Sequence, residues 1–205
     1  MAVSTATLDR VVYLSDVSWE TYEHLLADLS DQSAPRMTYD RGTLEIMSPT
    51  AEHEEINRAI ASLVEIVCEE LDLDCRNLGS TTFKRQDLVR GFEPDSCFYI
   101  ASLSRIKGKL EIDLLTDPPP DLVIEVDVTH SSIDKLSIFS SVGVPEVWRY
   151  DGSSRIYTLE SPRYVESTAS KALPQVDRLL LDNLIEAHSS RSWPEWVRMV
   201  RKSVR

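Results

Sequence analysis

The stretch Asp121-Leu122-Val123-Ile124-Glu125-Val126-Asp127-Val128 has the strongest strand pattern in the chain, and three prolines at 118–120 precede it. β-branched and aliphatic residues of this kind are typical of a buried strand, and the prolines stiffen the approach to it. Because side chains alternate between the two faces of a strand, Glu125 and Asp127 project from the same face as Val123. The sequence therefore predicts a central strand with two carboxylates on one face.

The cost of burying those carboxylates points to a cation. Taking ionised carboxylates out of water is unfavourable unless a cation, a proton or hydrogen-bond donors compensate. A further acid, Asp95, follows Pro94 at the start of a second apolar run. If the two strands are neighbours, Asp95, Glu125 and the backbone carbonyl of Val126 provide an all-oxygen shell of the kind that Mg²⁺ or Mn²⁺ prefers. The structural alternative is an aspartate that caps a turn and a glutamate that pairs with Lys or Arg.

Helical and strand patterns alternate along the rest of the chain. Helices are predicted after the N-cap residues Ser18 and Thr50, because apolar residues recur every three or four positions over 19–29 and 56–71. The other predicted elements are, in chain order, a hairpin over 36–48, strands over 75–85 and 92–100, a short helix that Ser131 or Ser132 caps and Gly143 ends, a hairpin over 145–159, and a helix over 179–187. This order predicts an α/β (α+β) domain in which a mixed β-sheet is flanked by helices.

Composition limits the class of protein. A chain of 205 residues with a formal net charge of -12 is expected to form one globular domain, and it is too acidic for a protein that coats DNA nonspecifically. A local basic cleft is still compatible with that charge. The cysteines Cys68, Cys75 and Cys97 form no CxxC motif, which favours reduced thiols over a zinc site or a disulfide framework. No stretch resembles a signal sequence or a membrane span, so the expected location is cytoplasmic.

Four ordered blocks of sequence carry a resemblance to a known family. They are Gly42-Thr43-Leu44-Glu45-Ile46-Met47-Ser48-Pro49 with His53 shortly after it, Gly91-Phe92-Glu93-Pro94-Asp95, residues 119–126, and residues 143–151. From about Ser18 to Leu159 the chain resembles the Uma-two family of bacterial restriction endonucleases, within the PD-(D/E)XK nuclease superfamily. The resemblance implies a restriction-endonuclease-like domain over 18–160, with an N-terminal extension over 1–17 and a C-terminal extension over 161–205 that carries a basic, Trp-containing tail.

The same resemblance implies a metal-dependent DNA endonuclease. It makes Asp95 the motif aspartate and Glu125 the motif glutamate, with Mg²⁺ or Mn²⁺ as the cofactor and DNA as the substrate. A homodimer or higher homo-oligomer is expected by analogy, because cleavage of both strands of a duplex needs two sites.

The sequence departs from the superfamily at Asp127, where the pattern of glutamate, any residue, lysine would place the lysine. A carboxylate cannot stabilise a negatively charged transition state as an ammonium does. Lys135 is the nearest replacement, since its long side chain can return from the next helix to the strand end. Alternatively Asp127 joins the metal shell, and Lys84, Lys107 or Arg149 supplies the positive charge.

Two further residues are accessory candidates. Glu45 lies on the second strand of the predicted hairpin and either faces the site or is exposed, and His53 either takes part in the site or packs along its helix. The acids of the same helix start, Glu52, Glu54 and Glu55, complement the helix dipole or extend the metal site. The tail from Trp193 to Arg205 is predicted to dock on its own domain or on a partner rather than to grip nucleic acid.

Two other functions fit the same sequence. The acid at Asp127 and the overall negative charge fit a catalytically inactive protein that keeps the nuclease fold for binding or scaffolding. A metal-dependent hydrolase of a smaller phosphodiester fits the same carboxylates, and it requires a narrow pocket instead of a cleft as wide as a duplex.

Overall fold

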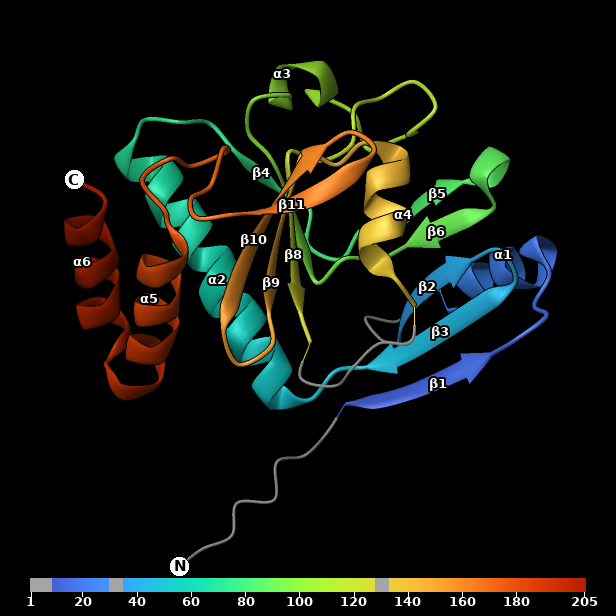
Figure 1. Ribbon diagram of the computed structural model, residues 1–205, viewed down its shortest axis with the longest axis horizontal. Coiled ribbons are helices and arrows are strands. Elements are labelled where there is room, and N and C mark those ends of the chain that lie inside the picture. The colour runs from blue at the N-terminus through green and yellow to red at the C-terminus, as the bar shows by residue number, and fades with distance from the viewer. Residues whose placement is uncertain (1–8, 30–34, 128–132) are drawn as a thin grey trace, which may run out of the picture.

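Two β-sheets lie next to one another in the computed structural model, which describes residues 9–29, 35–127 and 133–205 (Figure 1). The first sheet is antiparallel, with the strand order β1 (Arg10–Leu14), β3 (Thr43–Ser48), β2 (Arg36–Asp40), β6 (Arg90–Phe92) and β5 (Phe83–Arg85). The second sheet has the order β11 (Arg163–Ser167), β10 (Ser154–Glu160), β9 (Glu146–Tyr150), β8 (Leu122–Val126), β7 (Ser96–Tyr99) and β4 (Arg76–Asn77). It is mixed, because β8 and β9 run parallel and its other neighbours run antiparallel.

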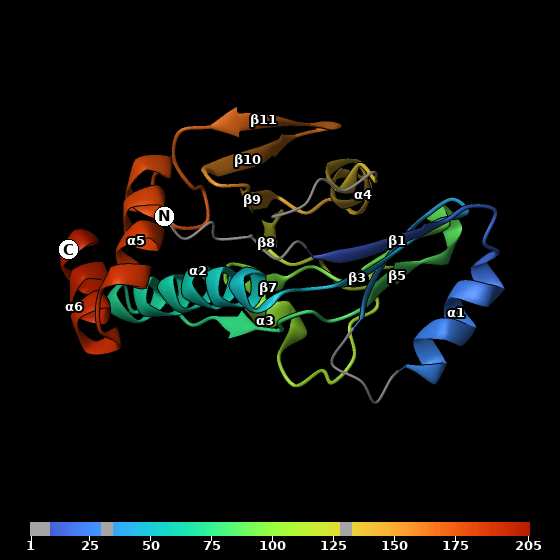
Figure 2. The ribbon, with the colours of Figure 1, turned by 90° about the horizontal axis from the view of Figure 1, so that it is seen from below.

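Helices cover both faces of the second sheet. The helices of the described residues are α1 (Trp19–Asp28), α2 (Ala51–Glu70), α3 (Leu103–Ile106), α4 (Lys135–Val142), α5 (Arg178–Ser190) and α6 (Trp193–Ser203), and a short 3₁₀ helix spans Gln86–Leu88; α1 packs on the first sheet. Figure 2 shows α5 and α6 on one side of this sheet and α4 on the other. In the ranges described, no helix has both the length and the apolar character that crossing a bilayer requires.

Strand β8 is the centre of the fold, as its sequence predicts. All five of its residues are buried, and it lies between β7 and β9. Leu122, Ile124 and Val126 pack with α2, α5 and α6 in one core cluster, whereas Val123 packs with Phe139 of α4 in another. The predicted alternation of faces is therefore confirmed, and the face of Glu125 is the one that α4 covers.

Local signals place several elements correctly. The Oγ of Ser18 accepts a hydrogen bond from the amide of Thr21 at 3.1 Å, and the Oγ1 of Thr50 accepts one from the amide of His53 at 3.2 Å, so both predicted N-caps are confirmed. Both hairpins form, and α4 ends at Gly143 in the left-handed conformation. The cap of α4 is Asp134, whose side chain accepts from the amide of Ser137; Ser131 and Ser132 lie outside the described residues.

The prediction of single strands over 75–85 and 92–100 is wrong, because each range divides between the two sheets. In the first range, the Oδ1 of Asn77 accepts from the amide of Gly79, whose φ of +55° turns the chain away from β4. In the second, the pairing of β6 ends at Phe92, Pro94 follows in the connecting segment, and β7 begins at Ser96. The crossing chain thus carries Asp95 to the junction of the sheets. The antiparallel first sheet and the strand β11 were not predicted either.

Both predicted extensions contribute to the packed structure. Strand β1 pairs with β3 over five residues. Trp196 and Val200 of α6 are buried in the same core cluster as α2, so the prediction that the tail docks on its own domain is confirmed. In the described ranges, its basic residues Arg201 and Arg205 form ion pairs with Glu70 of α2.

Glu146 connects the C-terminal segment to the sheet. Its Oε1 accepts hydrogen bonds from Nε1 of Trp148 and from Oγ of Ser170, each at 2.6 Å. Its Oε2 accepts from the amides of Lys171 at 2.6 Å and Ala172 at 3.2 Å. Four hydrogen-bond donors therefore depend on this one buried carboxylate as their acceptor.

We expect Glu146→Ala to lower the free energy of unfolding by roughly 3 kcal/mol, because buried donors lose their acceptor. Urea unfolding followed by circular dichroism measures this change. The matched control is Glu166→Ala, since Glu166 is an exposed strand glutamate. Equal midpoints for the two variants would contradict the assignment of Glu146 as a structural anchor.

Candidate functional site

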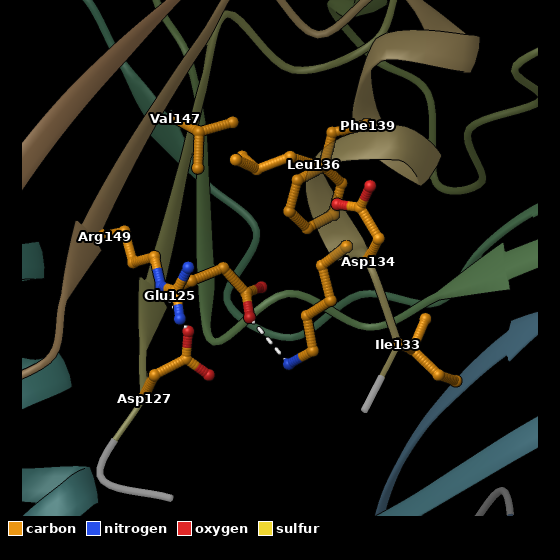
Figure 3. A pocket seen from close by; sticks show the side chains of 9 residues that line it. Glu125, Asp127, Ile133, Asp134, Leu136, Phe139, Val147 and Arg149 are labelled. Carbon is orange, nitrogen blue, oxygen red and sulfur yellow. Dashed lines mark hydrogen bonds and ion pairs between the residues drawn. The ribbon is translucent and has the colours of Figure 1, made fainter. Parts of the chain in front are cut away.

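The ends of several elements meet between the two sheets and bring the predicted residues together. The side chains come from Glu45 on β3, His53 on α2, Asp95 directly before β7, Glu125 at the fourth position of β8, and Lys135 at the first position of α4. A pocket of about 260 Å³ opens beside them, lined by Glu125, Asp127, Ile133, Asp134, Lys135, Leu136, Phe139, Val147 and Arg149 (Figure 3). It has an apolar wall from α4 and β9 and a charged end at the end of β8.

Asp95 is buried, and both of its carboxylate oxygens have partners. Oδ1 accepts a hydrogen bond from Nη1 of Arg36, and Nε2 of His53 lies 3.0 Å from the same oxygen. Oδ2 accepts from the amide of Val126 at 2.7 Å, which ties the residue to the end of β8. Burial raises the pKa of Asp95, but the hydrogen bond from His53 and the positive charge of Arg36 outweigh burial, so the net pKa lies below its usual value. Asp95 is therefore a carboxylate.

Glu125 is in a different environment. Nζ of Lys135 donates a hydrogen bond to its Oε2 at 2.7 Å, which is the dashed line in Figure 3. Its other oxygen, Oε1, is buried without a hydrogen-bond partner among the described residues. Burial raises the pKa of Glu125 to about 7, because the opposing effect of Lys135 is offset by the negative charges of Asp95 and Asp127. The side chain changes its protonation state near neutral pH.

Lys135 brings an ammonium group to the end of β8. Its Nζ lies 2.7 Å from Oε2 of Glu125 and 3.7 Å from Oε1 of Glu45, and the side chain is 13% exposed. Burial lowers the pKa of Lys135, but Glu125 and the other surrounding carboxylates raise it above its ordinary value. The end of β8 therefore has a protonated lysine side chain nearby, although the sequence pattern has Asp127 in place of its lysine.

Of the other residues predicted to supply positive charge, one borders the pocket and two lie on the surface. Arg149 forms an ion pair with Asp127, with 2.6 Å between Nε and Oδ2, so it borders the pocket but is already paired. Lys84 pairs with Glu23 on the surface, and Lys107 is exposed. Of the alternatives that the sequence left open, Lys135 and Arg149 thus reach the pocket, and Asp127 contacts Arg149.

Sequence reasoning missed three residues of this site. Arg36, on β2, donates to Asp95, and its Nη2 also donates to Glu54. Asn57 donates to the backbone carbonyl of Asp95 at 3.1 Å. Asp9 accepts from His53. The spacing of four residues between His53 and Asn57 on one helix face was a usable signal, but neither Arg36 nor Asp9 has a local signal that distinguishes it.

The carboxylate of Glu125 is better suited to bind a divalent cation than that of Asp95. The buried Oε1 of Glu125 has no hydrogen-bond donor among the residues that the structure describes, and a cation would satisfy it. The oxygens of Asp95 are engaged by Arg36, His53 and the amide of Val126. Within residues 9–29, 35–127 and 133–205, no group of three or more His, Cys, Asp or Glu side chains is arranged to hold a metal ion. Because Arg36 already contacts Asp95, a cation at this carboxylate would have to share it with the guanidinium of Arg36 or displace that group.

Comparison with known proteins bears on the same region. A model of the Uma2 (Uma-two) family, described as "Putative restriction endonuclease", matches residues 19–190. Among solved structures, a "putative nuclease belonging to DUF820" from Anabaena variabilis ATCC 29413 superposes with a TM-score of 0.57 and 13% identity, covering 82% of this chain and 99% of that one. At this identity the likeness establishes a shared fold. No curated protein matches the chain.

The raised pKa of Glu125 makes the stability of the protein depend on pH. Between pH 4.5 and about 7 the folded protein binds a proton at Glu125 that the unfolded chain does not bind, so this contribution is complete below pH 4.5 and is lost as the pH rises through 7. Lys135 stays protonated over this range. We expect Glu125→Gln to remove up to about 1.4 kcal/mol per pH unit from the slope.

Urea unfolding at pH 5, 6 and 7 with a chelator present measures that slope. Glu166→Gln, at an exposed strand position, is the control and should follow the parent protein. Parallel profiles for the parent and Glu125→Gln would show that burial does not shift this carboxyl group.

Proposed function

The chain belongs to the Uma2 family, and from this membership and the geometry around Glu125 we propose that it is a metal-dependent DNA endonuclease that hydrolyses phosphodiester bonds. The observation that carries the proposal is the ammonium of Lys135, which lies 2.7 Å from Glu125 at the end of β8. The charged end of the pocket thereby combines carboxylates and a cation, as hydrolysis of a phosphodiester requires. Mg²⁺ or Mn²⁺ is the proposed cofactor.

Each residue has a proposed role. Glu125, the carbonyl of Val126 and, in competition with Arg36, Asp95 would hold the cation, which would supply positive charge to the phosphate and lower the pKa of a water molecule. Lys135 donates to a phosphate oxygen and stabilises the charge that develops there. Glu45 and Asp127 contribute negative charge that keeps Lys135 protonated.

A catalytically inactive binding or scaffolding protein is the second candidate. The observation that favours it is that Arg36 and Lys135 already neutralise Asp95 and Glu125 from within the chain. The overall charge of -12 also disfavours tight binding to a polyanion. Such a protein would bind no divalent cation at these carboxylates.

Two further proposals concern the oligomeric state and the cellular location of the protein. We propose a homodimer, because two sites are needed to cut both strands of a duplex. We propose a cytoplasmic location, because Cys68, Cys75 and Cys97 are free thiols.

We expect the purified protein to nick supercoiled plasmid in the presence of Mg²⁺ or Mn²⁺, and Lys135→Ala to lower kcat by about 100- to 1000-fold through loss of the charge near the phosphate. Lys107→Ala is the matched control, since Lys107 is exposed. Circular dichroism of each variant checks that it is folded. Full activity of a folded Lys135→Ala variant would reject the role of Lys135, and hydrolysis of bis(4-nitrophenyl) phosphate without nicking would favour a smaller substrate.

Titration calorimetry with Mn²⁺ separates the endonuclease from the inactive protein. We expect binding by the parent protein and its loss in Glu125→Ala, because that variant lacks Oε1, the oxygen for which the described part of the chain supplies no hydrogen-bond donor. Glu166→Ala should bind as the parent does. Absence of Mn²⁺ binding to the parent protein would favour the inactive binding or scaffolding protein.

A further inference from the structure

Asp9 contacts the site from outside the region that the family model matches. It lies directly before β1, is 8% exposed, and precedes residue 19, where the match begins. Figure 1 shows β1 starting beside the first turn of α2. The two oxygens of Asp9 accept hydrogen bonds from that turn: Oδ1 from the amide of Thr50 at 2.7 Å, and Oδ2 from Nδ1 of His53 at 3.0 Å.

The contact with Asp9 requires a proton on Nδ1 of His53. A carboxylate that already accepts from Thr50 is an acceptor, so Nδ1 of His53 must be the donor whether the ring is neutral or charged. The opposite nitrogen, Nε2, then faces Oδ1 of Asp95 at 3.0 Å and Nη1 of Arg36 at 3.2 Å. His53 is fully buried, so a rotation of its ring would break contacts on both sides.

We propose that Asp9 is a positioning residue for Asp95 and that it acts through His53. The connected series runs from Asp9 to His53, from His53 to Asp95, and from Asp95 to the amide of Val126 at the end of β8. It holds the carboxylate of Asp95 in one orientation relative to Glu125, and small errors in such an orientation are costly in a reaction site. The effect on turnover rests on the proposed endonuclease function, whereas the effect on the orientation of Asp95 does not.

A purely structural role for Asp9 makes a different prediction. If Asp9 only fills space and joins β1 to α2, Asp9→Asn, which has nearly the same shape, should leave the site unchanged. The amide side chain has one acceptor and one donor end, so it can accept from either Thr50 or His53 and must present its NH₂ group to the other. We expect the NH₂ group to face Nδ1 of His53, so that Nδ1 loses its proton while Nε2 keeps the proton that it donates to Asp95.

Nuclear magnetic resonance of uniformly ¹⁵N-labelled protein without metal tests this directly. Long-range ¹H–¹⁵N spectra report which ring nitrogen of His53 is protonated, and the backbone signal of Val126 reports the contact with Asp95. In the parent protein we expect a protonated Nδ1. In Asp9→Asn we expect loss of that state and a shifted Val126 signal, while Asp16→Asn, at an exposed position of the same segment, leaves both unchanged.

Kinetics on plasmid provide the second measurement. We expect Asp9→Asn to lower kcat by about 10- to 100-fold with little change in KM, because DNA contacts are retained while the orientation of Asp95 is lost. An unprotonated Nδ1 in the parent protein would overturn the proposal, and this result requires no variant. A folded Asp9→Asn variant with parental signals for His53 and Val126 would overturn it as well. If the parent protein does not cut DNA but these signals respond as expected, the positioning role stands and the endonuclease proposal fails.

Discussion

The carboxylates of Asp95, directly before β7, and Glu125, on the neighbouring strand β8, are buried where the two sheets meet, and the chain itself supplies the cations that hold them. Buried negative charge of this kind is stable only with partners in good geometry. Arg36 from the first sheet and Lys135 from α4 must therefore reach the same point from different directions. The arrangement of β2, β8 and α4 around one junction satisfies that requirement.

The two acids differ because their partners differ. Asp95 accepts from the side chains of Arg36 and His53 and from the amide of Val126, which favours its ionised form. Burial raises the pKa of Glu125 to about 7 despite the charge of Lys135, and one of its oxygens has no hydrogen-bond donor in the described part of the chain. Pairs of acids with separated pKa values are common in reaction sites, although ion-pair networks also produce them.

The sequence predicts those parts of the structure that depend on neighbouring residues. The pattern of β8, the caps of α1 and α2, and the turn of the first hairpin are local, and all of them are present. The division of 75–100 between two sheets depends on strand pairing with residues far away in the chain, which no local pattern encodes. The site divides in the same way. Asp95, Glu125 and Lys135 were found from strand and motif patterns, whereas Arg36 and Asp9 contact Asp95 and His53 across 59 and 44 positions of sequence.

The long sequence separations within the site also have a consequence for biosynthesis. The residues of the site range from Asp9, which contacts His53, to Lys135 and Arg149, which pair with Glu125 and Asp127. During synthesis from the N-terminus the chain lacks the ammonium and the guanidinium of the pocket until Lys135 and Arg149 have been added, and contacts of this range are slow to form. The charged centre therefore assembles only after β9, which carries Arg149, has left the ribosome.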